Sequence, residues 1–198
     1  MPASSLVLAA ERSDVLNVVL HSLYGLSCDA YHPSFDCICA SFPSFTKYGL
    51  TPLSRYLRRG TPLFNTFLLH APLHPIQAYT LAASLHLEDL AVAASSYTLN
   101  LNLQHSILPD DADRMGERYL FRLYKLHTGR MDDLRAILQR TKLYPHIAGP
   151  HCSVEKRKEA SFAYGLACAQ VWHDASPGQS LSFVELVHAF FTAAKTEL

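Results

Sequence analysis

Residues 76–99 read IQAYTLAASLHLEDLAVAASSYTL, and this stretch predicts two closely packed α-helices. Its alanines favour helix and let two helices approach closely. Its leucines and its valine supply the apolar contact between the helices. The residues concerned are Ala82, Ala83, Ala91, Ala93 and Ala94, with Leu81, Leu85, Leu87, Leu90 and Val92. The stretch is typical of an all-helical scaffold and contains no pattern typical of a catalytic centre.

Apolar residues recur at helical spacing over most of the chain, and no run alternates as a strand would. We therefore predict a mainly α fold, a multi-helix bundle or array of antiparallel helix pairs. One helix is expected from Ser13, as its cap, to Gly25. Another is expected to start at Thr61 and Pro62, because proline suits the first helical position.

The second half of the chain is also predicted to be helical. Asp110 and its acidic neighbours are expected to open a helix that Gly129 ends. Asp132 and Asp133 are then expected to open a shorter helix. Residues 162–172 are apolar on most sides, which predicts a central helix.

The composition limits the kinds of partner. The chain has 198 residues, of which 49% are hydrophobic and only 17% charged, and its net charge is zero. So little charge suggests that a partner, or a missing piece of the protein, covers some apolar face. Zero net charge offers no bulk attraction to nucleic acid or to a membrane surface, so we expect protein partners. The segment from Gly60 to Leu87 contains no lysine, arginine, aspartate or glutamate. Prolines and polar residues interrupt the segment, so we expect no membrane span there.

The cysteines indicate a reducing compartment. They are odd in number and do not form the framework of a small secreted domain: Cys28, Cys37, Cys39, Cys152 and Cys168. With no basic segment before Leu6, a signal peptide is not expected, and we predict a cytoplasmic or nuclear location. His32 lies near the first three cysteines, but a Cys-x-Cys spacing fits zinc poorly. We expect buried thiols and no bound metal.

Two sequence patterns leave an enzymatic alternative open. Ser153 and Lys156 match the Ser-x-x-Lys of some hydrolases, although the companion motifs of those enzymes do not occur. His151 and Cys152 are adjacent and could form a nucleophile and base. The alternative function is thus a small helical hydrolase or transferase. The same serine is equally well interpreted as a helix cap. No nucleotide or cofactor motif occurs, and we expect no cofactor.

One basic pattern is the best candidate for a functional surface. Its members recur at steps of four, four and three, which would place them on one helical face: Arg114, Arg118, Arg122 and Lys125. Such a face could meet an acidic partner. Acidic side chains are interleaved with it, so an ordinary solvated face is the alternative interpretation.

Two segments at the start of the chain resemble the C-terminal helices of a BTB/POZ domain. The run Ser13 to His21 leads into Leu23-Tyr24-Gly25, and a second helical segment ends in Lys47-Tyr48-Gly49-Leu50. The helical remainder is similar to the C-terminal part of a large fungal group of BTB proteins. The blocks that carry this similarity are Thr61 to Asn65, Leu87 to Ala91, Arg114 to Gly116 with Tyr119 and Leu120, Leu126-His127 with Gly129-Arg130, and Ala167 to Trp172.

The resemblance implies a protein-interaction adaptor or scaffold that is not an enzyme, with possible self-association and docking to cullin ligases. It implies two parts, 13–60 as a remnant of the BTB domain and 61–198 as a helical extension, packed as one unit. A complete BTB domain begins with strands, and only twelve residues precede Ser13. The chain would then be a fragment, or would have lost that half of the domain. Pro43 is expected to kink or end its helix.

The resemblance also predicts an uncovered apolar face. The helix that begins at Ser13 carries Val15, Val18 and Val19 on more than one side. In a complete BTB domain such a helix lies in the core. Exposure of that much apolar surface is unfavourable. We therefore expect either self-association or coverage by other segments of the chain.

Overall fold

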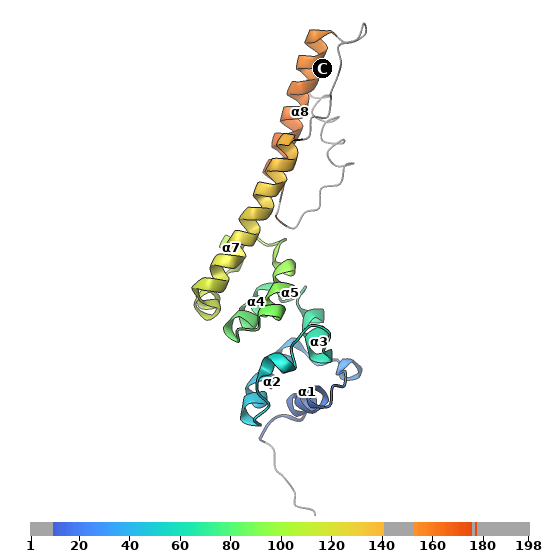
Figure 1. Cartoon of the computed structure of the whole chain (residues 1–198), viewed down its shortest axis with the longest axis vertical. Helices are drawn as coiled ribbons and strands as arrows, with labels where there is room; N and C mark the ends of the chain where they lie inside the picture. Colours follow the sequence, from blue (N-terminus) through green and yellow to red (C-terminus); the bar gives the residue numbers. More distant parts are fainter. Residues whose placement is uncertain (1–9, 141–152, 176, 178–198) are drawn as a thin grey trace, which may run out of the picture. The chain divides into compact units, whose positions relative to one another are not determined.

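The protein is mainly helical over the part that the structure, a computed structural model, describes: residues 10–140, 153–175 and 177. These residues form eight α-helices and two short 3-10 helices and no strand, which confirms the predicted mainly α fold (Figure 1). In chain order the elements are α1 (Ser13–Leu23), η1 (Asp29–Tyr31), α2 (Phe35–Lys47), η2 (Leu53–Arg55), α3 (Pro62–His70), α4 (Pro75–Ser84), α5 (Glu88–Thr98), α6 (Leu103–Ser106), α7 (Pro109–Arg140) and α8 (Val154–Asp174). None of the described helices is both long enough and apolar enough to cross a bilayer.

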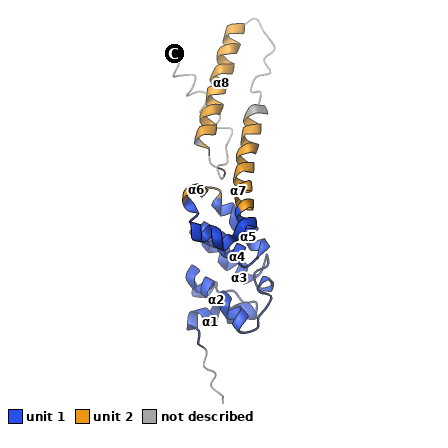
Figure 2. Cartoon of the chain, turned by 90° about the vertical axis from the view of Figure 1, so that its left-hand side faces the viewer, with its two compact units in different colours: residues 1–98, 106–120 blue, residues 99–105, 121–198 orange. Residues whose placement is uncertain are grey.

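The chain divides into two compact units (Figure 2). Unit 1 comprises residues 1–98 and 106–120, and unit 2 comprises residues 99–105 and 121–198. The predicted parts, 13–60 and 61–198, were expected to pack as one unit, and that division of the chain stays a prediction. Helix α3 packs against both α1 and α2, so residues on either side of the boundary between these parts belong to the same unit.

Helices α4 and α5 form the predicted pair and are the most extensively packed elements of unit 1 (Figure 1). Ala82, Ala83, Leu90 and Ala94 are fully buried, because small side chains allow the two backbones to approach closely. His86 ends α4 in the left-handed conformation, with φ of 53°. Around it, the Leu87 amide donates to the Ala82 carbonyl at 2.9 Å, and the His86 amide donates to the Ala83 carbonyl at 3.0 Å. These two bonds satisfy carbonyls that a helix end otherwise leaves unpaired.

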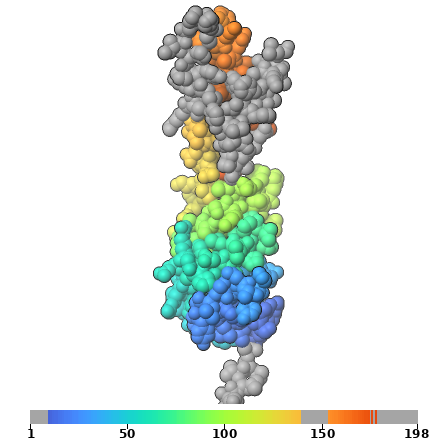
Figure 3. Space-filling view, turned by 90° about the vertical axis from the view of Figure 1, so that its right-hand side faces the viewer, coloured from blue at the N-terminus to red at the C-terminus, as the bar shows by residue number. Residues whose placement is uncertain are grey.

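A second core forms where α1, α2 and α3 meet. Val15, Val18 and Val19 are buried, so other segments of the chain cover that side of α1, which is one of the two outcomes expected for the helix. Leu20 and Leu23 on the same helix are exposed. Phe45 and Phe67 are fully buried in the same core. In the space-filling view of Figure 3, the surface of α1 (blue) adjoins that of the segments of unit 1 that follow it. Arg12 rather than Ser13 is the cap residue of α1.

Several predicted helix boundaries were wrong. Helix α2 continues through Pro43 and does not end there, and Phe42 and Phe45 on either side of the proline are buried in the core. Helix α7 continues through Gly129, where glycine costs only about 1 kcal/mol relative to alanine, so no separate helix starts at the following aspartates. Residues 162–172 form part of α8, but Phe162 is more than half exposed, so the expected central position was also wrong.

Candidate functional site

A candidate site of unit 1 begins at the C-terminal end of α1. The helix ends in a left-handed turn at Gly25, whose φ is 67°, a conformation that glycine adopts without steric cost. The Leu26 amide donates to the His21 carbonyl at 2.8 Å, and the Gly25 amide donates to the Ser22 carbonyl at 3.2 Å. This turn fixes the positions of Leu23 and Tyr24 at the end of the helix.

The opposite wall of the site comes from the turn that precedes α3. The Thr61 hydroxyl contacts the Tyr56 carbonyl at 2.6 Å and the Arg58 carbonyl at 2.8 Å, and it thereby holds this turn closed. Because the hydroxyl is used in this way, the Thr61 side chain does not cap α3. Helix α3 then starts at Pro62, and Leu63, which is buried, follows directly.

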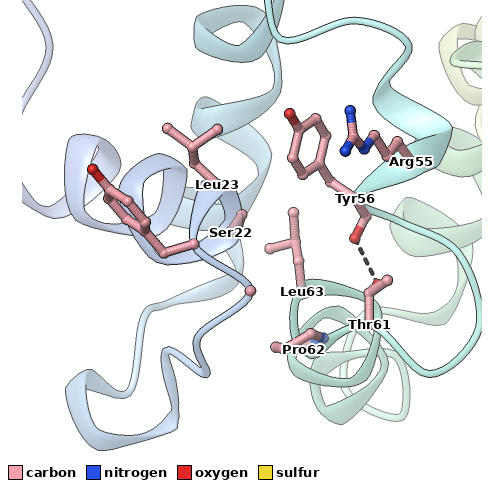
Figure 4. Close-up of a pocket in the computed structure, with 9 residues that line it drawn as sticks. Ser22, Leu23, Arg55, Tyr56, Thr61, Pro62 and Leu63 are labelled. Carbon is pink, nitrogen blue, oxygen red and sulfur yellow. Dashed lines mark hydrogen bonds between the residues drawn. The ribbon is translucent and has the colours of Figure 1, made fainter.

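Together these two segments enclose a half-open pocket with a volume of about 390 Å³. Figure 4 shows Leu63 between the end of α1 and Tyr56, with Arg55 beside the tyrosine ring. This volume is within the range of ligand-binding pockets in proteins. The residues that line it are Ser22, Leu23, Tyr24, Gly25, Arg55, Tyr56, Thr61, Pro62 and Leu63.

Large apolar side chains are exposed in the last part of α1 and just after it, and two of them, Leu23 and Tyr24, line the pocket. Leu20 and Leu23 are each 43% exposed, Leu26 is 55% exposed and Tyr24 is 73% exposed. All four belong to α1 or to the turn that ends it. Single exposed apolar side chains are common on protein surfaces, but a group of them beside a pocket marks an interaction site more often than chance would.

The charge around the pocket is positive. Arg55 lines the pocket, and Arg58 and Arg59 are exposed in the turn that follows. Residues 50–87 contain no aspartate and no glutamate. Asp29, the first acid after α1, accepts a hydrogen bond from the Thr66 hydroxyl at 3.1 Å. The pocket therefore combines an apolar lining with a cationic edge.

The four basic residues singled out from the sequence do not form one continuous helical face. Gly116 lies between Arg114 and Arg118 with φ of 73° and ψ of 160°, which are not helical angles, so the phase of the helix changes there. Arg114 and Arg118 belong to unit 1, whereas Arg122 and Lys125 belong to unit 2. Arg118 lies over the ring of Tyr119, 5.9 Å from its centroid. A role for these residues in binding a partner stays a prediction.

The serine of the Ser-x-x-Lys pattern is a helix cap. The Ser153 hydroxyl accepts a hydrogen bond from the backbone amide of Lys156 at 3.2 Å, and α8 begins at the next residue. Both side chains are exposed. His151 and Cys152, the other candidate pair, lie outside the described residues.

The three cysteines near the start of the chain, which were considered as metal ligands together with His32, differ in their burial. Cys28 and Cys37 are buried, Cys39 is half-buried and His32 is exposed. Burial raises the pKa of the Cys28 and Cys37 thiols, and burial together with the nearby Asp36 carboxylate raises the pKa of Cys39 to about 11. Thiols with raised pKa values are poor nucleophiles and poor ligands. The described part of the chain holds no cluster of three or more metal-ligating side chains.

A contact near the start of the chain was not anticipated from the sequence. The Lys47 ammonium and the Tyr48 hydroxyl both donate to the Glu11 carboxylate, so the residues before α1 are held against the end of α2. These hydrogen bonds, the one from Lys47 first, lower the pKa of Glu11. No local pattern signals this contact, because Glu11 lies far from its partners in the sequence.

Burial of the His127 side chain in unit 2 predicts a change of stability with pH. The His127 side chain is buried in α7, and burial lowers its pKa below the ordinary value of 6.5. As the pH falls from about 7 to 5, the unfolded chain therefore takes up a proton at this position before the folded chain does, and stability falls. Replacing His127 with glutamine should make the free energy of unfolding less dependent on pH over that range.

Urea unfolding of both proteins, at a series of pH values, measures this effect. As the pH is lowered from about 7 to 5, the free energy of unfolding should fall more for the wild type than for the variant. An unchanged difference across the range would contradict a lowered pKa for His127.

Comparison of the chain with models of protein families, with curated proteins and with solved structures found no match.

Proposed function

We propose that the chain is a protein-interaction module without catalytic activity, of the adaptor or scaffold kind that the resemblance to BTB/POZ proteins implies. The observation that supports this most directly is the pocket at the end of α1 with exposed apolar side chains around it. Leu23, Tyr24 and Leu26 are exposed on either side of the turn at Gly25, and backbone hydrogen bonds close that turn. A rigid arrangement of this kind lowers the entropic cost of binding.

The chemistry of the pocket also favours recognition over catalysis. Binding hot spots are enriched in tyrosine and arginine and lie around well-packed pockets. Tyr24, Arg55 and Tyr56 are of those types, and all three line the pocket. The alternative of a hydrolase or transferase gains no support from Ser153, because its hydroxyl is already used to cap α8.

Replacing Leu23 with aspartate tests the proposal. The change puts a charge among the exposed apolar side chains, so partner proteins that copurify with the full chain should fall about tenfold in abundance. Quantitative mass spectrometry of the copurified proteins gives this ratio. Sedimentation of the purified chain shows whether the partner is a second copy. The melting temperature should change little, because Leu23 is 43% exposed.

Leu73→Asp is the matched control. Leu73 lies between α3 and α4 and is 78% exposed, so the same change of leucine to aspartate occurs away from the pocket. This control should retain the partners of the wild type. If both variants retain them equally, the surface at the end of α1 is not the interaction site. Turnover of ester or peptide substrates by the purified chain would refute the proposal that it lacks catalytic activity.

A further inference from the structure

We infer that the pocket at the end of α1 binds a short acidic peptide segment of a partner protein, with a large apolar side chain of that segment inserted into the pocket. This inference rests on the proposed function and specifies the partner's chemistry. Its basis is the combination of an apolar lining, a cationic edge and the N-terminal end of a helix at one place. Each of these features selects a different part of the same ligand.

The apolar part of the ligand is selected by the pocket lining. Leu23, Pro62 and Leu63 contribute aliphatic surface, and Tyr56 contributes its ring. Leu63 is buried, so the pocket is floored by a side chain that the core holds in place. A leucine, methionine or phenylalanine side chain of the peptide would displace water from this apolar surface and bury its own. A wholly polar peptide would bury no apolar side chain there.

The acidic part of the ligand is selected by Arg55 and by the start of α3. Arg55 lines the pocket, and its guanidinium can form a bidentate pair with a carboxylate. Helix α3 begins at the edge of the pocket, and its positive end is not neutralised by a side-chain cap. Arg58 and Arg59 add positive charge in the turn that follows, and residues 50–87 contain no acid. Asp29, an acid that contacts α3, accepts a hydrogen bond from the Thr66 hydroxyl, so three arginines face one nearby carboxylate. A basic segment would therefore be repelled.

A peptide fits these features better than a membrane or a nucleic acid would. The cationic edge comprises three arginines within residues 55–59, whereas binding to nucleic acid usually needs an extended basic surface. The pocket is closed on two sides by α1 and by the turn before α3, which suits a single inserted side chain. Peptide segments that present an apolar anchor beside charged residues are a common mode of recognition.

Three fluorescent peptides of about fourteen residues test the inference by fluorescence polarisation with the full chain. The first carries a central leucine and phenylalanine flanked by aspartate and glutamate. The second carries the same apolar residues flanked by lysine. The third keeps the acids but has serine in place of the apolar residues. We expect the first to bind at least about tenfold more tightly than either of the others, and more weakly as salt is added.

Charge reversal at the pocket should change this preference. Arg55→Glu should weaken binding of the acidic peptide about tenfold and reduce its dependence on salt. Arg55→Lys keeps the charge but loses the bidentate geometry, and should recover part of the affinity. Lys158→Glu, at an exposed site in α8, makes the same change of net charge away from unit 1 and should have no effect. Circular dichroism checks that each variant keeps its helical content.

The outcomes separate this inference from the proposed function. The inference is wrong if the three peptides bind alike, if the basic peptide binds best, or if Arg55→Glu has no more effect than Lys158→Glu. In those cases the proposed function still stands if Leu23→Asp removes the partners of the full chain. If Leu23→Asp removes no partner, the proposed function itself fails. Selective binding to anionic lipid vesicles, in place of the acidic peptide, would also overturn the inference.

Discussion

Replacing Phe67 with alanine is expected to lower the free energy of unfolding of unit 1 by about 3–5 kcal/mol. Phe67 lies in α3 and is fully buried where α1, α2 and α3 meet. Its ring centroid lies 5.6 Å from that of Phe35 and 6.0 Å from that of Phe42, so both neighbours would lose contact surface. The close packing of the core limits how far the neighbours can relax into the cavity.

Leu69→Ala provides the control on the same helix. Leu69 is 69% exposed, so its truncation should change stability by less than about 0.5 kcal/mol. Urea unfolding monitored by circular dichroism measures both variants. Equal and small effects of the two substitutions would show that α3 does not pack against α1 and α2 as described. That result would also remove the basis for the pocket, because α3 supplies one of its walls.

The parts of the fold that the sequence predicted were those set by local chemistry. Alanine and leucine at helical spacing between Ile76 and Leu99 predicted the α4 and α5 pair, and Pro62 marked the start of α3. Gly25 was expected to end α1, and it does so through the left-handed turn that glycine favours. In each case the residue itself determines the backbone conformation, so no distant contact is needed to predict it.

The failed predictions depended on contacts from distant parts of the chain. Pro43 does not end α2, and the phenylalanines on both sides of it are buried in the core. The Tyr79 hydroxyl donates to the Tyr119 carbonyl at 2.9 Å across forty positions of sequence, and no local pattern indicates such a bond. The break in α7 at Gly116 has a local cause, because glycine readily adopts the non-helical angles found between Arg114 and Arg118. The residues around Gly116 also suit a continuous helix, so the sequence alone did not predict the break.

The candidate site could be predicted only in part, for the same reason. The arginines of the turn before α3 and the tyrosine at the end of α1 are visible in the sequence as a basic segment and a Tyr-Gly step. What the sequence does not show is that the Thr61 hydroxyl closes that turn and so sets Tyr56 opposite Leu23. The pocket depends on this hydrogen bond and on the packing of α3, both of which are properties of the folded chain.

Replacing Ala82 with leucine should destabilise unit 1 by about 1–3 kcal/mol. Ala82 is fully buried in α4, which packs along α5. Small side chains allow the two helices to lie close together, so three additional carbon atoms must either displace α5 or adopt a strained rotamer. Leucine is a good helix former, so the loss would come from packing and not from helix propensity.

Gln77→Leu on the same helix separates these two causes. Gln77 is exposed, so leucine there adds the same side chain without crowding α5. Its effect on the free energy of unfolding should be within about 0.5 kcal/mol of zero. If Ala82→Leu were equally neutral, the spacing between α4 and α5 would not depend on small residues. The alanine-rich pattern of residues 76–99 would then reflect helix propensity alone, and the argument that it specifies a closely packed pair would fail.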